Sequence, residues 1–190
     1  MNEVTLHSPL GGITTTVALD RLLTRTSTEL ETLYTTASVP SLLDVHGDLR
    51  GRMLAWPSLD RPSSWRSLLG ASLRAFASAS AFPWLGKSFT RDATKGAGIN
   101  RVVSDRLRLF RFETFIAKSR AGNFDALQLD YDLPGNPPII RSIKDEIREI
   151  EPGLWLGQAY FHPSRTDAAH SQSKPHDWLW LYFGLARIDG

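Results

Sequence analysis

The feature that most constrains the fold is a series of eight short strand-like segments separated by turn residues. Glycine, asparagine and proline clusters mark the turns between the segments. Evenly spaced strands that accompany only two helical segments favour an antiparallel meander closing into an up-and-down β-barrel over a parallel α/β sheet. The sequence therefore predicts a mainly β chain with added helices. The strand-like segments are residues 45–56, 84–90, 100–104, 106–118, 125–133, 139–150, 154–162 and 178–188.

Two segments have helical periodicity. Leucines and Tyr34 recur at helical spacing within residues 14–37, which predicts one amphipathic helix that ends before Pro40. An apolar stripe predicts a second helix over residues 63–81, inserted after the first strand. We accordingly expect an N-terminal helical segment at residues 1–40 and a ligand-binding barrel domain at residues 41–190. The N-terminal helix is a candidate lid over the mouth of the barrel.

Residues 139–150 fit two structures. In a strand, the isoleucines at positions 139, 143 and 147 share one face with Arg141 and Asp145. The charged run 144–149 favours a helix instead, whereas the isoleucine content favours a strand. A strand is the preferred interpretation because both neighbouring segments are strands.

Composition excludes several function classes. The 190 residues, 42% of them hydrophobic, suffice for one globular unit, and 22 basic against 20 acidic residues indicate no nucleic-acid partner. The lack of cysteine excludes disulfides, thiolate metal sites and thiol catalysis. No metal or cofactor is expected, since the histidines at positions 162, 170 and 176 are irregularly spaced. Neither an export signal nor a membrane span is apparent, so we expect a cytoplasmic protein, with homodimerisation left open.

Three segments carry a family resemblance. Gly47-Asp48-Leu49-Arg50-Gly51 is followed by Arg52, Trp84-Leu85-Gly86-Lys87-Ser88-Phe89 comes next, and Asp145-Glu146-Ile147-Arg148 leads to Leu156-Gly157. In this order they resemble the bacterial GXWXG domain of unknown function, with Leu49 at the position of the family's tryptophan. That family is related to the lipocalin-like, or calycin, barrels. The resemblance implies a barrel with a ligand cavity and implies no particular reaction.

Polar residues on predicted strands are the candidates for chemistry. Asp130 and Asp132 share one face, opposite Leu129 and Tyr131. If such a face points into the barrel, low dielectric raises the pKa of an unpaired carboxyl, as proton transfer to an enolisable substrate requires. The alternative is that these charges coat the outside or pair between strands. The candidate catalytic residues are Asp145 and Asp130 as acid or base and Tyr160 as hydrogen-bond donor.

The ligand-binding candidates are of two kinds. Arg148 or Lys87 would hold an oxygen or a carboxylate of the ligand, and Arg141 is grouped with them. Trp178, Trp180 and Tyr182 fall on one predicted strand face, which either lines a cavity or packs on the helices.

Together these features predict an enzyme that folds a small hydrophobic molecule inside the barrel and moves protons on it. The chemistry would be non-redox and cofactor-independent, of the cyclase, isomerase or lyase type. The alternatives are a non-catalytic carrier or sensor with the same cavity, and a protein-interaction module with a filled barrel.

Overall fold

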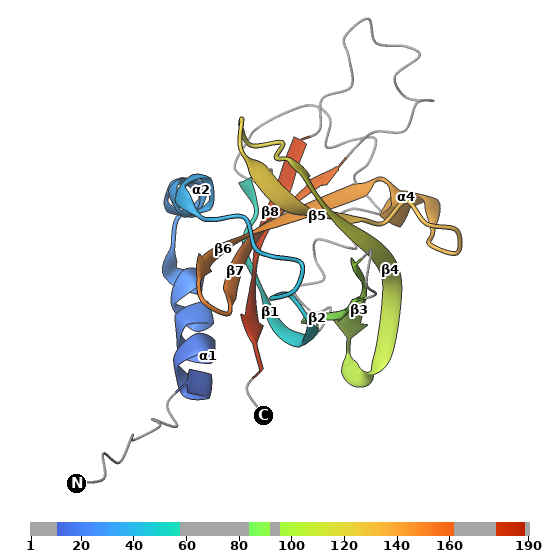
Figure 1. Ribbon diagram of the computed structural model, residues 1–190, viewed down its shortest axis with the longest axis horizontal. Helices are drawn as coiled ribbons and strands as arrows, with labels where there is room; N and C mark the ends of the chain where they lie inside the picture. Colours follow the sequence, from blue (N-terminus) through green and yellow to red (C-terminus); the bar gives the residue numbers. More distant parts are fainter. Residues whose placement is uncertain (1–10, 58–83, 92–95, 162–177, 189–190) are drawn as a thin grey trace, which may run out of the picture.

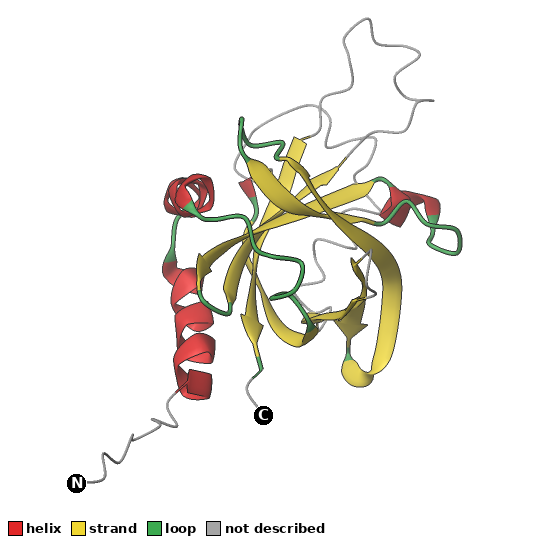
Figure 2. Ribbon diagram, in the orientation of Figure 1, coloured by secondary structure: helices red, strands yellow, loops and turns green. Residues whose placement is uncertain are grey.

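A computed structural model describes residues 11–57, 84–91, 96–161 and 178–188 (Figures 1 and 2). Within these ranges, eight antiparallel strands form a closed barrel in which each strand pairs with its sequence neighbours and the last pairs with the first. The predicted up-and-down barrel, of the lipocalin-like kind, is thus confirmed. The strands are β1 (Gly47–Ala55), β2 (Trp84–Arg91), β3 (Gly96–Val102), β4 (Ser104–Lys118), β5 (Asp125–Asp130), β6 (Ile143–Glu151), β7 (Leu154–Phe161) and β8 (Trp178–Arg187).

The ambiguous segment is a strand for most of its length. In β6, Ile143 and Ile147 join the barrel core and Asp145 lines its interior, whereas Glu146 meets a helix on the outside. The short helix α4 (Pro138–Arg141) takes up the first residues, because a proline at the first helical turn favours that start. Arg141 therefore does not share the strand face of Asp145, which corrects that part of the prediction.

Apolar side chains fill the half of the barrel interior where β1 begins. Leu49 and Leu127 are fully buried there, and Phe89 packs edge-on against Phe112 with ring centroids 5.2 Å apart. Trp155 and Leu185, also fully buried, belong to the same cluster. Side chains can fill an eight-stranded barrel or leave room for one small ligand. The same apolar cluster continues into the other half of the barrel, where its side chains line a cavity.

Two glycines allow β1 and β2 to approach each other closely. A Cβ added to Gly51 would lie 2.7 Å from the Cα of Gly86 and 2.5 Å from the ring of Trp84. Gly86 itself has φ of +130°, a conformation that other residues rarely adopt. The lack of side chains at Gly51 and Gly86 therefore makes the close approach of the two strands possible.

The N-terminal region forms two helices, so the prediction of a single helix over residues 14–37 is wrong. Helix α1 (Gly11–Arg21) continues into the 3₁₀ turn η1 (Leu22–Thr24), and α2 (Ser27–Thr36) starts anew. The break has a local cause, a capping box at Thr26. Thr26 Oγ1 accepts a hydrogen bond from the Glu29 N–H (3.3 Å), and Glu29 Oε2 accepts one from the Thr26 N–H (2.8 Å).

Both helices pack on the outer wall of the barrel, as Figure 2 shows. Leu19 of α1 and Leu22 of η1 pack against outward-facing residues of β7 and β8, and Tyr34 of α2 packs against Leu156 and Tyr182. None of the residues that line the interior cavity comes from α1 or α2. The expectation that this region is a lid over the mouth is therefore corrected. The helix expected at residues 63–81 lies outside the described residues.

Candidate functional site

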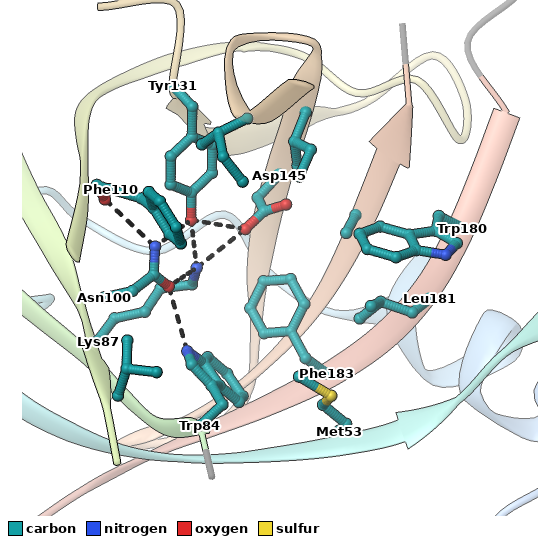
Figure 3. A pocket seen from close by; sticks show the side chains of 14 residues that line it. Met53, Trp84, Lys87, Asn100, Phe110, Tyr131, Asp145, Trp180, Leu181 and Phe183 are labelled. Atoms are coloured by element: carbon teal, nitrogen blue, oxygen red, sulfur yellow. Dashed lines mark hydrogen bonds and ion pairs between the residues drawn. The ribbon is translucent and has the colours of Figure 1, made fainter. Parts of the chain in front are cut away.

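A half-enclosed cavity of about 80 Å³ occupies the barrel end where β1 and β7 finish and where β2, β6 and β8 start (Figure 3). Most of its wall is apolar. Four polar residues also face it, namely Lys87 of β2, Asn100 of β3, Tyr131 just after β5 and Asp145 of β6, and we call them the polar cluster. The apolar lining includes Met53, Trp84, Phe110, Ile143, Trp180 and Phe183.

The polar cluster is centred on an ion pair. Lys87 Nζ donates to Asp145 Oδ2 at 2.9 Å and to Asn100 Oδ1 at 2.9 Å, and it also contacts the Tyr131 hydroxyl. The Tyr131 hydroxyl in turn donates to Asp145 Oδ2 at 3.0 Å. Trp84 Nε1 donates to Asn100 Oδ1 at 3.1 Å, which extends the network along the cavity wall (Figure 3). Three strands and one strand end thus hold a single hydrogen-bonded unit.

The electrostatics of the cluster follow from its burial. The side chains of Lys87 and Asp145 are only 3% and 6% exposed. Desolvation lowers the pKa of Lys87, and the neighbouring Asp145 carboxylate opposes that shift. Burial, and next the charge of Asp145, raise the pKa of Tyr131 well above its ordinary value, so its hydroxyl keeps its proton at neutral pH.

Aromatic rings surround the buried ammonium group. Lys87 Nζ lies between 5.1 and 5.4 Å from the ring centroids of Trp84, Phe112 and Phe183. The negative faces of such rings attract a cation within about 6 Å. These rings offset part of the loss of hydration that lowers the pKa of Lys87.

One oxygen of the cluster lacks a partner. Asp145 Oδ1 is buried and has no hydrogen-bond partner among the described residues, whereas Oδ2 accepts from both Lys87 and Tyr131. Figure 3 shows the free oxygen turned away from Lys87, toward the side of the cavity where Trp180 lies. An unsatisfied buried polar atom costs about 1–3 kcal/mol. A hydrogen-bond donor that entered the cavity would recover that free energy.

Among the predicted site residues, Asp145, Lys87 and Trp180 line the cavity together. Asp130 does not. It faces outward from β5, where it forms an ion pair with Lys144. Arg141 is also outside, exposed at the end of α4, and pairs with Asp132 at 2.6 Å. The expectation that Asp130 and Arg141 belong to the site is therefore corrected.

Tyr160 and Arg148 lie on the outer face of the barrel. The Tyr160 hydroxyl donates to Gln158 Oε1 at 2.6 Å. The Arg148 guanidinium lies over the ring of Phe124, 4.1 Å from its centroid, and donates to the carbonyl of Ala37. Both predicted roles in the site are corrected, because strand alternation places these residues opposite the inward-facing Ala159 and Asp145.

A bulge in β8 separates the three aromatic residues that were predicted to share a face. Ala159 pairs with Leu181 and Tyr160 pairs with Leu179, so Trp180 is an extra residue in the ladder. Trp180 lines the cavity, whereas Tyr182 packs outside against α2. Trp178 stacks on Phe161 at 5.3 Å and is not among the lining residues. The predicted cavity wall is therefore corrected for Tyr182 and for Trp178.

Two cluster members were absent from the predicted site. Tyr131 follows Asp130 directly, so strand alternation places Tyr131 inside the barrel when Asp130 faces outward. Asn100 had no comparable signal, since it is one polar residue at the start of a predicted strand.

A second buried polar group attaches α2 to the outer wall. Glu146, which is fully buried, accepts hydrogen bonds from the Tyr34 hydroxyl (2.9 Å), from Gln128 Nε2 (3.2 Å) and from the backbone N–H of Arg120 (3.1 Å). Desolvation, and next the charge of Glu146, raise the pKa of Tyr34. These groups are satisfied by one another and are part of the scaffold.

The part of the chain that the structure describes contains no group of three or more histidine, aspartate, glutamate or cysteine side chains placed to hold a metal ion. It also contains no helix long and apolar enough to cross a membrane. The three histidines considered above lie outside the described residues.

Comparisons with known proteins give no information about function. No protein-family model and no curated protein matches the chain. The chain is similar to a crystal structure of a protein from Thermomonospora curvata, with a TM-score of 0.47 and 14% identity, over 92% of this chain and 95% of the other. The class of the molecule therefore comes from its own structure, which is a closed eight-stranded up-and-down barrel with a cavity at one end.

Proposed function

We propose that the barrel binds a small, largely apolar molecule and carries out non-redox, cofactor-independent proton transfer on it, as a cyclase, isomerase or lyase does. Asp145 is the acid or base. The observation that carries the proposal is a buried carboxylate with one paired and one unpaired oxygen on the wall of a mostly apolar cavity.

The geometry suits a general base. Lys87 and Tyr131 hold one carboxylate oxygen, which fixes the direction of the other before a ligand arrives. A polar group held in place in a water-poor cavity needs little rearrangement during the reaction. The aromatic walls can hold a flexible substrate in a folded conformation, so that proximity and orientation contribute to the rate.

A carrier or sensor is the second candidate, and one observation favours it. The other predicted catalytic residues, Asp130 and Tyr160, face outward, so Asp145 is the single carboxylate among the described residues that line the cavity. Binding without turnover needs no second acid or base. The interaction module with a filled barrel loses support because a cavity takes up one end of the interior.

The resemblance to the GXWXG domain remains part of the proposal. The similar segments lie in β1, β2, β6 and β7, and two of their residues, Lys87 and Asp145, form the central ion pair. The resemblance gains support from Trp84, Lys87 and Asp145, which line one cavity, whereas the β1 segment contributes no lining residue.

The test has two stages. Native mass spectrometry of the purified protein should detect a co-purified small molecule, which is then incubated with the protein in heavy water and followed by NMR for product or deuterium uptake. We expect Asp145→Asn to abolish the reaction even at ligand concentrations that saturate the variant, whereas Asp130→Asn, a matched change outside the barrel, leaves both reaction and affinity intact. Binding without any reaction in the native protein favours the carrier. A protein with no co-purified molecule and no affinity for small apolar probes contradicts the proposal.

A further inference from the structure

The atoms of the polar cluster differ in how much hydrogen-bonding capacity they have left for a ligand. An ammonium group has three N–H donors, and those of Lys87 are directed at Asp145 Oδ2, Asn100 Oδ1 and the Tyr131 hydroxyl. An anionic ligand could bind this cation only by displacing one of these partners, because all three N–H donors already have an acceptor. Lys87 is therefore a positioning residue for Asp145, and the expectation that it anchors a ligand carboxylate is revised.

The neutral members of the cluster are also engaged. The Tyr131 hydroxyl donates to Asp145 Oδ2 and accepts from Asn100 Nδ2 at 3.2 Å. Asn100 Nδ2 also donates to the Phe110 carbonyl at 3.2 Å, and Asn100 Oδ1 accepts from Lys87 and Trp84. Within the cluster, the atom that remains is Asp145 Oδ1, which as a carboxylate oxygen can only accept.

The charge balance of the cavity further limits the chemical class of the ligand. The positive charge of Lys87 and the negative charge of Asp145 cancel inside the cavity. A carboxylate ligand would add a buried negative charge next to Asp145, and an ammonium ligand would add a second buried positive charge. Burying an uncompensated charge is far more costly than burying a hydroxyl that makes a hydrogen bond.

We propose that the ligand of this cavity is a neutral apolar molecule with a hydroxyl group, an alcohol or a phenol, that donates its hydrogen bond to Asp145 Oδ1. This inference rests on the proposed function, since it specifies the polar end of the same small molecule. The donated proton is also the one that Asp145 is placed to accept in proton transfer. The ligand would thus make one hydrogen bond to Asp145 Oδ1 and bury the apolar rest of its surface against Trp180 and Phe183.

Matched probes test the inference in the native chain. The probes are toluene, 4-methylphenol, 4-methylbenzoate and 4-methylbenzylamine, which share one ring and differ in the polar group. Calorimetric titration at neutral pH should show 4-methylphenol binding about ten- to a hundredfold more tightly than toluene, the range for a hydrogen bond to a charged group. The benzoate and the benzylamine should bind more weakly than 4-methylphenol.

Two variants connect the preference to Asp145. In Asp145→Asn the ammonium of Lys87 loses its counter-charge, so the benzoate should gain affinity while the advantage of 4-methylphenol shrinks. In the double variant Lys87→Met with Asp145→Leu, neither charge remains, and toluene and 4-methylphenol should bind within about threefold of each other. Asp130→Asn should leave all four affinities unchanged. Thermal unfolding of each variant verifies that a folded protein was titrated.

The outcomes separate the two proposals. Equal binding of toluene and 4-methylphenol by the native protein, or tighter binding of the benzoate or the benzylamine, overturns the hydroxyl inference and leaves the apolar-ligand function standing. Failure of all four probes, together with no co-purified molecule, overturns the proposed function itself.

Discussion

Replacing the buried ion pair tests whether the polar cluster exists for the cavity or for stability. The cycle consists of Lys87→Met, Asp145→Leu and the double variant. Lys87 Nζ and Asp145 Oδ2 are 2.9 Å apart, which gives an attraction of about 6 kcal/mol at an effective dielectric constant of about 20. Desolvation of the two ions costs several kcal/mol each, so the pair as a whole contributes little net stability.

The single and double variants should therefore behave very differently. Lys87→Met leaves the Asp145 carboxylate buried without its counter-ion, a loss of about 3–5 kcal/mol in the free energy of unfolding. Asp145→Leu leaves a buried ammonium group among the aromatic rings, with a loss of similar size. The double variant removes both charges and should range from unchanged stability to a gain of about 4 kcal/mol.

Urea unfolding, followed by tryptophan fluorescence, measures the effect. All four proteins must show the same m-value, so that a shift in midpoint reports stability alone. A double variant that is as unstable as the sum of the two single variants would refute the reasoning, because the pair would then be a net contributor to folding. A stable double variant that has lost the ligand preference would show that the charges serve the cavity.

Two further predictions concern pH and helix capping. Burial, and next the charge of Asp145, raise the pKa of Tyr131 above its ordinary 10.0. Above pH 10 the folded state therefore retains a proton that the unfolded chain releases. The contribution of this protonated hydroxyl to stability is complete below pH 10 and is lost as the pH rises further. Tyr131→Phe should therefore lose less stability between pH 9 and pH 11 than the native chain, as measured by urea unfolding, and an equal loss in both proteins would contradict the assignment. Thr26→Ala removes the side-chain cap of α2 and should lower the free energy of unfolding by about 1 kcal/mol, measured by the same method. Thr32→Ala, a matched exposed position within α2, should cost nothing, and equal effects at the two positions would exclude capping as the cause.

Local pattern was sufficient for the number of strands and for several side-chain directions, but the third strand, predicted at residues 100–104, runs from Gly96 to Val102. The alternation of Asp130 with Tyr131 predicts that the two face opposite ways, and the same period separates Asp145 from Arg148. The start of a second N-terminal helix after Thr26 can also be predicted from the sequence, because a threonine followed three residues later by a glutamate is typical of a capping box. The regular leucine spacing continues across the break and hides this signal.

The bulge in β8 shows why the predicted aromatic wall failed. Alternation along Trp178, Trp180 and Tyr182 holds only while the ladder has no extra residue, and Trp180 is that residue. Nothing in the local sequence marks it, since the register depends on how Leu179 and Leu181 pair with β7. One inserted position sends Tyr182 to the outer wall under α2.

The sequence by itself determined the barrel, because eight short strands with turns between them have few ways to pair all their edges. It also marked Lys87 and Asp145 as chemically capable residues. Only the tertiary structure decided that these two, 58 residues apart on strands that are not neighbours, meet across the interior. The physical reason is that a period of two assigns each residue to one of two faces, whereas closure of the sheet decides which face is inside and which side chains lie opposite one another.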